Sequence, residues 1–125
     1  MSRILRVLLV DDEEYVVDAL KLLLERAMLC QVFTANSGKA ALRLAQSQKP
    51  DVILLDVMMP GMSGGEVAEA LQESTATSNI PVIFLTGLLG KSELPGHRST
   101  IGGKIYVSKP APLDAIIQAI TESCK

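Results

Sequence analysis

The sequence has few of the residues that mark several common classes of protein. Its 125 residues include no Trp, two Tyr, two Phe, one His and two Cys. The cysteines, Cys30 and Cys124, are far apart in the chain and lie in no Cys-x-x-Cys motif, which disfavours a zinc site or a disulfide scaffold and indicates a reducing, cytoplasmic compartment. His97 has no other His or Cys beside it, so we expect it to be a solvated loop residue.

Long hydrophobic runs and an excess of positive charge are also absent. No apolar stretch reaches the roughly 20 residues that cross a bilayer, and no charged start precedes an apolar signal core, so we expect no membrane contact. Twelve Lys and Arg against fourteen Asp and Glu give a formal net charge of -2. Because binding to a phosphate backbone needs clustered Lys and Arg, we expect this domain to make no direct contact with nucleic acid.

The chain has enough apolar residues for one folded domain. Hydrophobic residues make up 48% of the sequence, and a chain of 125 residues can bury a core of useful size. We find no internal repeat and no low-complexity tract. We therefore expect residues 1–125 to form a single domain, and the sequence leaves open whether this domain is a whole protein or part of a longer one.

Short apolar runs alternate with helical patterns along the chain. The runs that predict strands are Ile4–Val10, Cys30–Ala35, Val52–Leu55, Pro81–Thr86 and Lys104–Ser108. Helices are predicted between them, the first at about Glu14–Ala27 and the last from Leu113 to about Ile120. Strands that alternate with helices form parallel βαβ units with right-handed crossovers. The expected fold is an α/β, doubly wound five-stranded parallel sheet in the order 2-1-3-4-5, with helices on both faces, as in flavodoxin-like proteins.

Apolar residues on the predicted helices indicate the faces that pack on the sheet. In the first helix the expected stripe consists of Val16, Leu20, Leu23, Leu24 and Ala27. In the last helix the spacing i, i+3, i+4, i+7 is met by Leu113, Ile116, Ile117 and Ile120. The third helix is expected to begin in Ser63-Gly64-Gly65, which we interpret as a flexible start.

The segment Leu88–Gly103 departs from this pattern. By alternation it should hold the fourth helix, but it has no clean apolar stripe and contains Gly90, Pro95, Gly96, Gly102 and Gly103. A proline inside a regular helix loses a hydrogen bond and clashes with the preceding turn. We therefore expect a short or irregular fourth helix here, or a mobile loop.

Polar side chains follow the predicted strands at the points where the strands end. Asp11 and Asp12 follow the first strand, Asp56 the third, Thr86 the fourth and Lys109 the fifth. Because parallel strands bring their carboxyl ends to one edge of a sheet, we expect these residues to lie together. Three carboxylates in one place repel each other, and a hard divalent cation such as Mg²⁺, which prefers oxygen ligands, relieves the repulsion.

This set of residue types suits phosphoryl transfer. The protein's part in that chemistry is mostly positioning and charge neutralisation, and an aspartate can itself attack to give an aspartyl-phosphate. We hypothesise that Asp56 accepts a phosphoryl group, with Lys109 as a positive charge for a phosphoryl oxygen. Simpler interpretations exist: Asp11 and Asp12 as charges at a helix start, Lys109 as a surface lysine, and Thr86 as a strand-end residue that satisfies backbone groups.

The order of these motifs resembles that of the response-regulator receiver domains of two-component signalling. The resemblance runs from Val7 to about Ile120 and rests on Leu-Val-Asp-Asp-Glu at 9–13, Asp-Val-Met-Met-Pro-Gly at 56–61, Thr86-Gly87 and Lys109-Pro110. It implies a switch that takes a phosphoryl group from a sensor histidine kinase or a histidine phosphotransfer protein and acts on a downstream output domain or protein. Such a domain catalyses only its own phosphorylation and dephosphorylation, so the resemblance implies a switch and not an enzyme.

The resemblance also implies roles for individual residues. Asp56 matches the phosphoacceptor, and Lys109 matches the lysine of the site. Thr86 matches the switch hydroxyl, and Tyr106 matches the switch aromatic on the fifth strand. The implied Mg²⁺ ligands are Asp11, acting through water, and Asp12, Asp56 and the backbone carbonyl of Met58.

Two other functions fit part of the sequence. A receiver-like module that binds protein partners without phosphorylation would account for the irregular Leu88–Gly103 segment, although the intact acidic pair, acceptor and lysine argue against it. A phosphatase with an aspartate nucleophile usually needs a second Asp two residues further on, where this chain has Met58. We therefore favour the phosphoacceptor switch.

Overall fold

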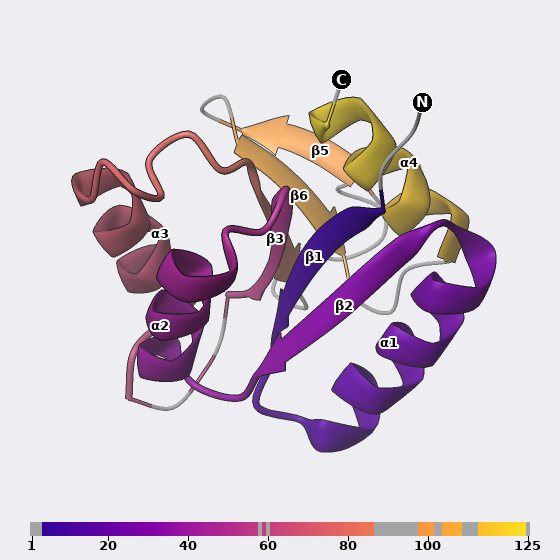
Figure 1. The fold of residues 1–125 in the computed structure, drawn as a ribbon, viewed down its shortest axis with the longest axis horizontal. Helices are drawn as coiled ribbons and strands as arrows, with labels where there is room; N and C mark the ends of the chain where they lie inside the picture. The colour runs from indigo at the N-terminus through magenta and orange to yellow at the C-terminus, as the bar shows by residue number, and fades with distance from the viewer. Residues whose placement is uncertain are drawn as a thin grey trace.

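A computed structural model of the chain shows one sheet with helices packed on both of its faces (Figure 1). It describes residues 4–57, 59, 61–86, 98–101, 104–108 and 113–124, and of 86, 98–101, 104–108, 113 and 114 it describes the backbone alone. The strands in these ranges are β1 (Leu5–Val10), β2 (Cys30–Ala35), β3 (Val52–Asp56), β4 (Val82–Thr86), β5 (Arg98–Ile101) and β6 (Lys104–Ser108). The helices are α1 (Glu14–Ala27), α2 (Gly38–Gln48), α3 (Gly64–Glu73) and α4 (Leu113–Ser123). None of the helices in the described ranges is long and apolar enough to cross a bilayer.

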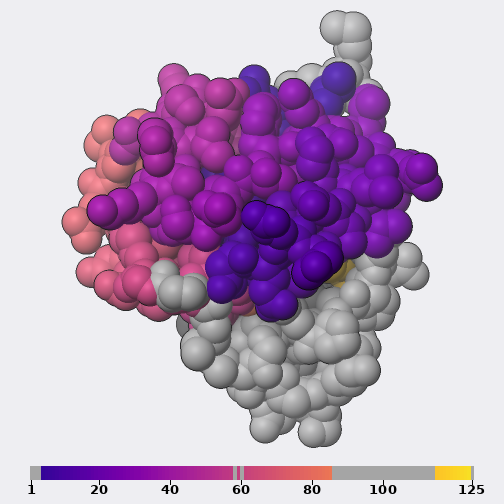
Figure 2. All heavy atoms as spheres, turned by 90° about the horizontal axis from the view of Figure 1, so that it is seen from below, coloured from indigo at the N-terminus to yellow at the C-terminus, as the bar shows by residue number. Residues whose placement is uncertain are grey.

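The strand order confirms the predicted doubly wound arrangement. The sheet runs β2-β1-β3-β4-β6-β5, and β6 is the strand that the sequence predicts as the fifth. The four neighbouring pairs from β2 to β6 are all parallel. The carboxyl ends of these strands therefore meet at one edge of the sheet, at the bottom of Figure 1 and facing the reader in Figure 2.

The sheet has one strand more than the sequence predicts. β5 pairs antiparallel with β6, with Ile101 opposite Lys104. For residues 98–101 the expectation of a helix or loop is therefore wrong. Thr100 and Ile101 are β-branched and suit a strand. The remainder of the expected fourth helix, 88–97, lies outside the described residues.

Two apolar clusters enclose the sheet, and β3 contributes to both. Val52 and Leu54 belong to the cluster under α1 and α4, whereas Ile53 and Leu55 belong to the cluster under α2 and α3. All four side chains are fully buried. A fully buried aliphatic side chain contributes about 1.5–3 kcal/mol, so β3 is held firmly on both faces. This burial explains the continuous apolar run in the sequence.

The buried face of α1 differs from the predicted stripe. Val17 and Leu24 are buried and Leu20 is partly buried against the same cluster, whereas Leu23 is 45% exposed. The predicted places of Leu23 and Ala27 on the stripe are wrong, because both residues are exposed whereas Val17 and Leu24 face the sheet. With three leucines in succession, the packing partner decides which of them is buried.

Side chains of α1 cover part of the free edge of β2, the outermost strand on this side. The Glu25 carboxylate accepts a hydrogen bond of 2.9 Å from the Val32 N–H, and Lys21 Nζ donates one of 3.0 Å to the Val32 carbonyl. The bond from Val32 lowers the pKa of Glu25, burial opposes this shift, and the charge of Lys21 adds to it. An unpaired strand edge is a template for pairing with other strands. These two bonds satisfy the Val32 N–H and carbonyl, in the middle of the free edge of β2.

We predict that Glu25→Ala lowers the free energy of unfolding at neutral pH but not in acid. The pKa of Glu25 is lower in the folded chain, so its charge stabilises the fold above the unfolded pKa of about 4.3 and the effect is lost as the pH falls through the folded pKa. The expected loss at pH 7 is about 1 kcal/mol or less, because the bond is a single one and solvent screens it. Urea unfolding at about pH 7 and about pH 3 measures it.

Asp18→Ala is the matched control for Glu25→Ala. Asp18 is an exposed acid on the same helix, and no hydrogen bond joins its side chain to β2 in the described part of the chain. It should show a smaller difference from the natural protein at pH 7. A loss for Glu25→Ala that is equal at both pH values would show that the carboxylate charge does not support the edge.

Candidate functional site

The three carboxylates predicted to meet do lie together at the carboxyl edge of the sheet. Asp11 and Asp12 follow β1 and Asp56 ends β3, the neighbouring strand. One carboxylate oxygen from each of the three residues lies within 4.8 Å of the others. Asp11 is fully buried, Asp56 is 5% exposed, and Asp12 is open to solvent. Figure 2 looks onto this edge, where atoms from the first half of the chain, coloured indigo to magenta, form much of the visible face.

Backbone hydrogen bonds orient Asp11. Its N–H donates to the Ala35 carbonyl at 3.1 Å, which extends the β1–β2 pairing by one residue. Its Oδ1 accepts from the Glu13 N–H at 3.0 Å. This is an Asx-type turn, in which a short acidic side chain bonds the backbone two residues on. The turn leads the chain into α1 and sets the direction of the Asp11 carboxylate.

Val57, the residue that follows Asp56, is held from two sides. The Val57 N–H donates to the Leu85 carbonyl of β4 at 3.1 Å, and the Val57 carbonyl accepts from the Gly64 N–H at 3.0 Å. The end of β3 is thus bonded both to the next strand and to the first residue of α3. These bonds, together with the burial of β3, give the Asp56 carboxylate a defined position.

The start of α3 is fixed by a capping box. Ser63 Oγ accepts from the Glu66 N–H at 3.2 Å, and the Glu66 carboxylate accepts from the Ser63 N–H at 3.1 Å. The expectation of a flexible start is therefore wrong, because two of the free N–H groups at this helix end are satisfied. The Ser-x-x-Glu spacing is visible in the sequence and could have identified the cap.

The structure describes the other predicted site residues only in part. β4 ends at Thr86, and Tyr106 lies in β6 opposite Phe84, so both backbones belong to the parallel part of the sheet. The side chains of Thr86 and Tyr106 lie outside the described atoms, as do Met58 and Lys109 altogether. The roles of these four residues remain predictions.

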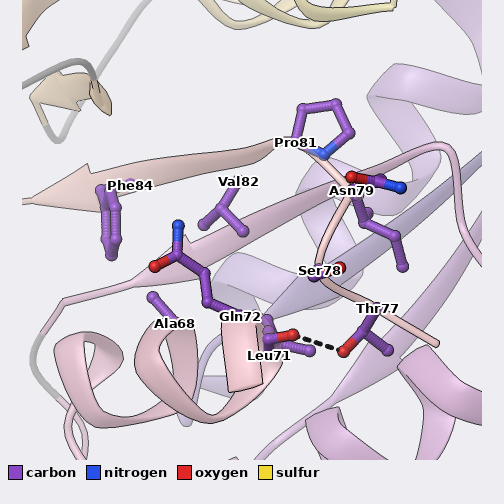
Figure 3. Close-up of a pocket in the computed structure, with 10 residues that line it drawn as sticks. Ala68, Leu71, Gln72, Thr77, Ser78, Asn79, Pro81, Val82 and Phe84 are labelled. Carbon is purple, nitrogen blue, oxygen red and sulfur yellow. Dashed lines mark hydrogen bonds between the residues drawn. The ribbon is translucent and has the colours of Figure 1, made fainter. Parts of the chain in front are cut away.

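Two of the hollows in the described part of the chain are lined by strand residues, and one of these two adjoins the carboxylates. It has a volume of about 460 Å³ and is lined by Asp11, Glu14 and Asp18 together with residues of β2 and α2. The other, of about 350 Å³, lies between α3 and the first half of β4 (Figure 3), where Thr77 Oγ1 donates a 2.6 Å hydrogen bond to the Leu71 carbonyl. Because β4 begins at the opposite edge of the sheet, this second hollow is not part of the carboxylate site.

Comparisons with known proteins agree on one family. The family described as "Response regulator receiver domain" matches residues 7–121. The chain is 34% identical to Protein PilH of Pseudomonas aeruginosa over 116 residues, covering 92% of this chain and 93% of PilH. It is also 42% identical to Response regulator PleD of Caulobacter vibrioides over 106 residues, covering 84% of this chain but 23% of PleD.

The solved structures show the same relationship. The chemotaxis protein CheY4 of Vibrio cholerae superposes with a TM-score of 0.81 at 25% identity, covering 97% of this chain and 99% of CheY4. The chain belongs to the response regulator receiver domain family. Receiver domains of this family are signalling switches of two-component systems. The chain spans nearly the whole of PilH but less than a quarter of PleD. Its relatives therefore include a protein of similar length and a much longer one.

We predict that Asp12→Asn stabilises the protein when no divalent cation is present. Three carboxylates within 4.8 Å of each other repel, and the substitution removes one charge while it keeps the size of the side chain. Because Asp12 is exposed and solvent screens its charge, we expect a modest rise in Tm of roughly 2–4 °C. Thermal unfolding in the presence of a chelator measures it.

Glu14→Gln is the control for Asp12→Asn, because it removes the same charge from an exposed residue that is not a member of the cluster. Its effect on Tm should be smaller. If Asp12→Asn instead lowered the Tm in the chelator, the three carboxylates would not repel each other as their spacing predicts.

Proposed function

We propose that residues 1–125 form a single receiver domain in which Asp56 accepts a phosphoryl group. The observation that carries the proposal is the meeting of Asp11, Asp12 and Asp56 at the carboxyl edge of the sheet. Asp56 is the last residue of a strand that is buried along its whole length. A carboxylate with a defined position is suited to attack a phosphorus atom, because holding the reacting groups in place lowers the barrier.

The chemistry of the cluster fits Mg²⁺ as its cofactor. It offers oxygen atoms only, and exposed Asp12 leaves one side in contact with solvent, which suits an ion that keeps several waters and is often held by one or two carboxylates. Asp11, Asp12 and Asp56 would hold the ion, with the carbonyl of Met58 as a further predicted ligand. When bound, Mg²⁺ supplies positive charge that offsets the charge of the phosphoryl group and the carboxylates.

The proposed donor is a phosphohistidine on a sensor histidine kinase or a histidine phosphotransfer protein. A carboxylate oxygen of Asp56 forms a bond to phosphorus while the bond from phosphorus to the donor imidazole nitrogen breaks, which leaves aspartyl-phosphate and a histidine. The imidazole nitrogen that is released takes up a proton from water, which balances the step. Neither Cys30 nor Cys124 takes part in a disulfide in the described part of the chain, which supports the proposed cytoplasmic location of this reaction.

The residues of the neighbouring strands would turn phosphorylation into a change of shape. We propose that Lys109 neutralises a phosphoryl oxygen and that the Thr86 hydroxyl moves toward the same group. Tyr106 would follow Thr86, since their strands, β4 and β6, are adjacent. The new contacts would shift a two-state equilibrium, and a downstream output domain or protein would bind the favoured state. On this proposal the domain is a switch and not an enzyme with a separate substrate.

The proposal is tested by the intact mass of the protein after incubation with Mg²⁺ and acetyl phosphate. We expect a gain of one phosphoryl group, which Asp56→Asn abolishes and a chelator prevents. Asp51→Asn is the matched control, because Asp51 precedes β3 at the opposite edge, where its carboxylate bonds the Arg6 N–H at 2.8 Å. That variant should gain the phosphoryl group as the natural protein does.

A folded, Mg²⁺-saturated protein that gains no mass would contradict the proposal for this donor. The same experiment with a phosphorylated histidine phosphotransfer protein then extends the test to the proposed natural donor. Failure with both would favour the alternative function, a receiver-like module that binds protein partners without phosphorylation.

A further inference from the structure

Gly64, the first residue of α3, packs directly against the backbone of Asp56. A Cβ atom at this position would overlap the Asp56 carbonyl oxygen and would lie 2.8 Å from Val57 Cα and 3.1 Å from the Asp56 carbonyl carbon. Non-bonded carbon atoms sit at about 3.5–4.0 Å, so no side chain fits there without a shift of the backbone. Glycine is therefore required at Gly64 by the space available.

The peptide between Asp56 and Val57 has little freedom to move away from α3. Its N–H is bonded to the Leu85 carbonyl of β4 at 3.1 Å, and Val57 is bonded through its carbonyl to the Gly64 N–H at 3.0 Å. α3 is also held in place. Its capping box fixes the first turn, and Val67 and Leu71 are buried against the core. A methyl group at Gly64 would push these two constrained parts apart.

We propose that Gly64 is a positioning residue for the cluster of Asp11, Asp12 and Asp56. Close packing of α3 on the Asp56–Val57 peptide sets the direction in which the Asp56 carboxylate leaves the backbone, and thereby the affinity of the cluster for Mg²⁺. This inference rests on the proposed function, because it takes the cluster as the Mg²⁺ site. Mg²⁺ requires near-octahedral geometry with ligands at about 2.0–2.1 Å, so a small shift of one carboxylate weakens binding.

A second glycine supports the loop that leads to Gly64. Gly38, the first residue of α2, is buried, and a Cβ there would lie 2.6 Å from Met62 Sδ and 2.9 Å from Met62 Cβ. Met62 stands two residues before Gly64 and packs against the apolar cluster under α2 and α3. The thioether end of Met62 can rotate but its Cβ cannot, so a methyl group at Gly38 would shift the backbone at Met62. We expect this to disturb the site less than a methyl group at Gly64, because Met62 is two residues from Gly64 whereas Gly64 meets the backbone of Asp56 directly.

The experiment compares Gly64→Ala with Gly65→Ala by isothermal titration of the unphosphorylated protein with Mg²⁺. We expect Gly64→Ala to weaken binding roughly 10- to 100-fold, the range seen when a residue that supports a metal ligand is changed. Gly65→Ala makes the same chemical change one residue further on, where the nearest atom to a new Cβ is Ser63 Oγ at an ordinary 3.8 Å. Its affinity for Mg²⁺ should equal that of the natural protein.

Thermal unfolding without Mg²⁺ separates positioning from simple loss of stability. A folded variant that is merely less stable keeps its Kd for Mg²⁺ at 25 °C, whereas a displaced carboxylate raises that Kd. If Gly64→Ala does not fold, Gly38→Ala takes its place, with a smaller loss of affinity expected.

Three outcomes decide the inference. Weaker Mg²⁺ binding by folded Gly64→Ala, with unchanged binding by Gly65→Ala, supports it. Folded Gly64→Ala, or Gly38→Ala in its place, with the affinity of the natural protein overturns it and leaves the proposed function intact. Natural protein that binds no Mg²⁺ overturns the Mg²⁺ site itself, and the role of Gly64 with it.

Discussion

Burial of β3 on both faces is the constraint on which the rest of this structure depends. Each of its four aliphatic side chains contributes about 1.5–3 kcal/mol to one of the two apolar clusters. Repulsion between carboxylates near a protein surface is of the order of a few kcal/mol at contact distance. The core can therefore hold Asp56 close to Asp11 and Asp12 although their charges oppose it.

The residues just beyond the strands give this edge its detailed shape. Asp11 bonds the Glu13 N–H, Ser63 and Glu66 cap α3, and Gly64 lies against the Asp56 backbone. Each of these contacts replaces a loosely held turn by one with a single arrangement. The proposed phosphoryl transfer would need such turns, since errors of a fraction of an ångström in the placement of a carboxylate would reduce both metal binding and rate.

Most of the fold was predictable because its signals are local. The apolar runs of β1, β2, β3, β4 and β6 are short and continuous, helical patterns separate them, and parallel order follows from that alternation. The cluster of Asp11, Asp12 and Asp56 was predictable for the same reason, because adjacent parallel strands must end side by side. Burial within α1 was predicted less well. Leu22, Leu23 and Leu24 are equally apolar, and only contact with the sheet distinguishes Leu24 from its neighbours.

The sequence by itself determined the five parallel strands and the residue type that follows or ends each of them, since periodicity and composition encode both. Tertiary structure decided that 98–101 joins the sheet as an antiparallel edge strand, because its partner β6 lies beside it. Tertiary structure also decided that Gly64 meets Asp56. That contact depends on the angle and distance at which α3 packs on the sheet, and these come from side chains spread over the whole core, which no local pattern contains.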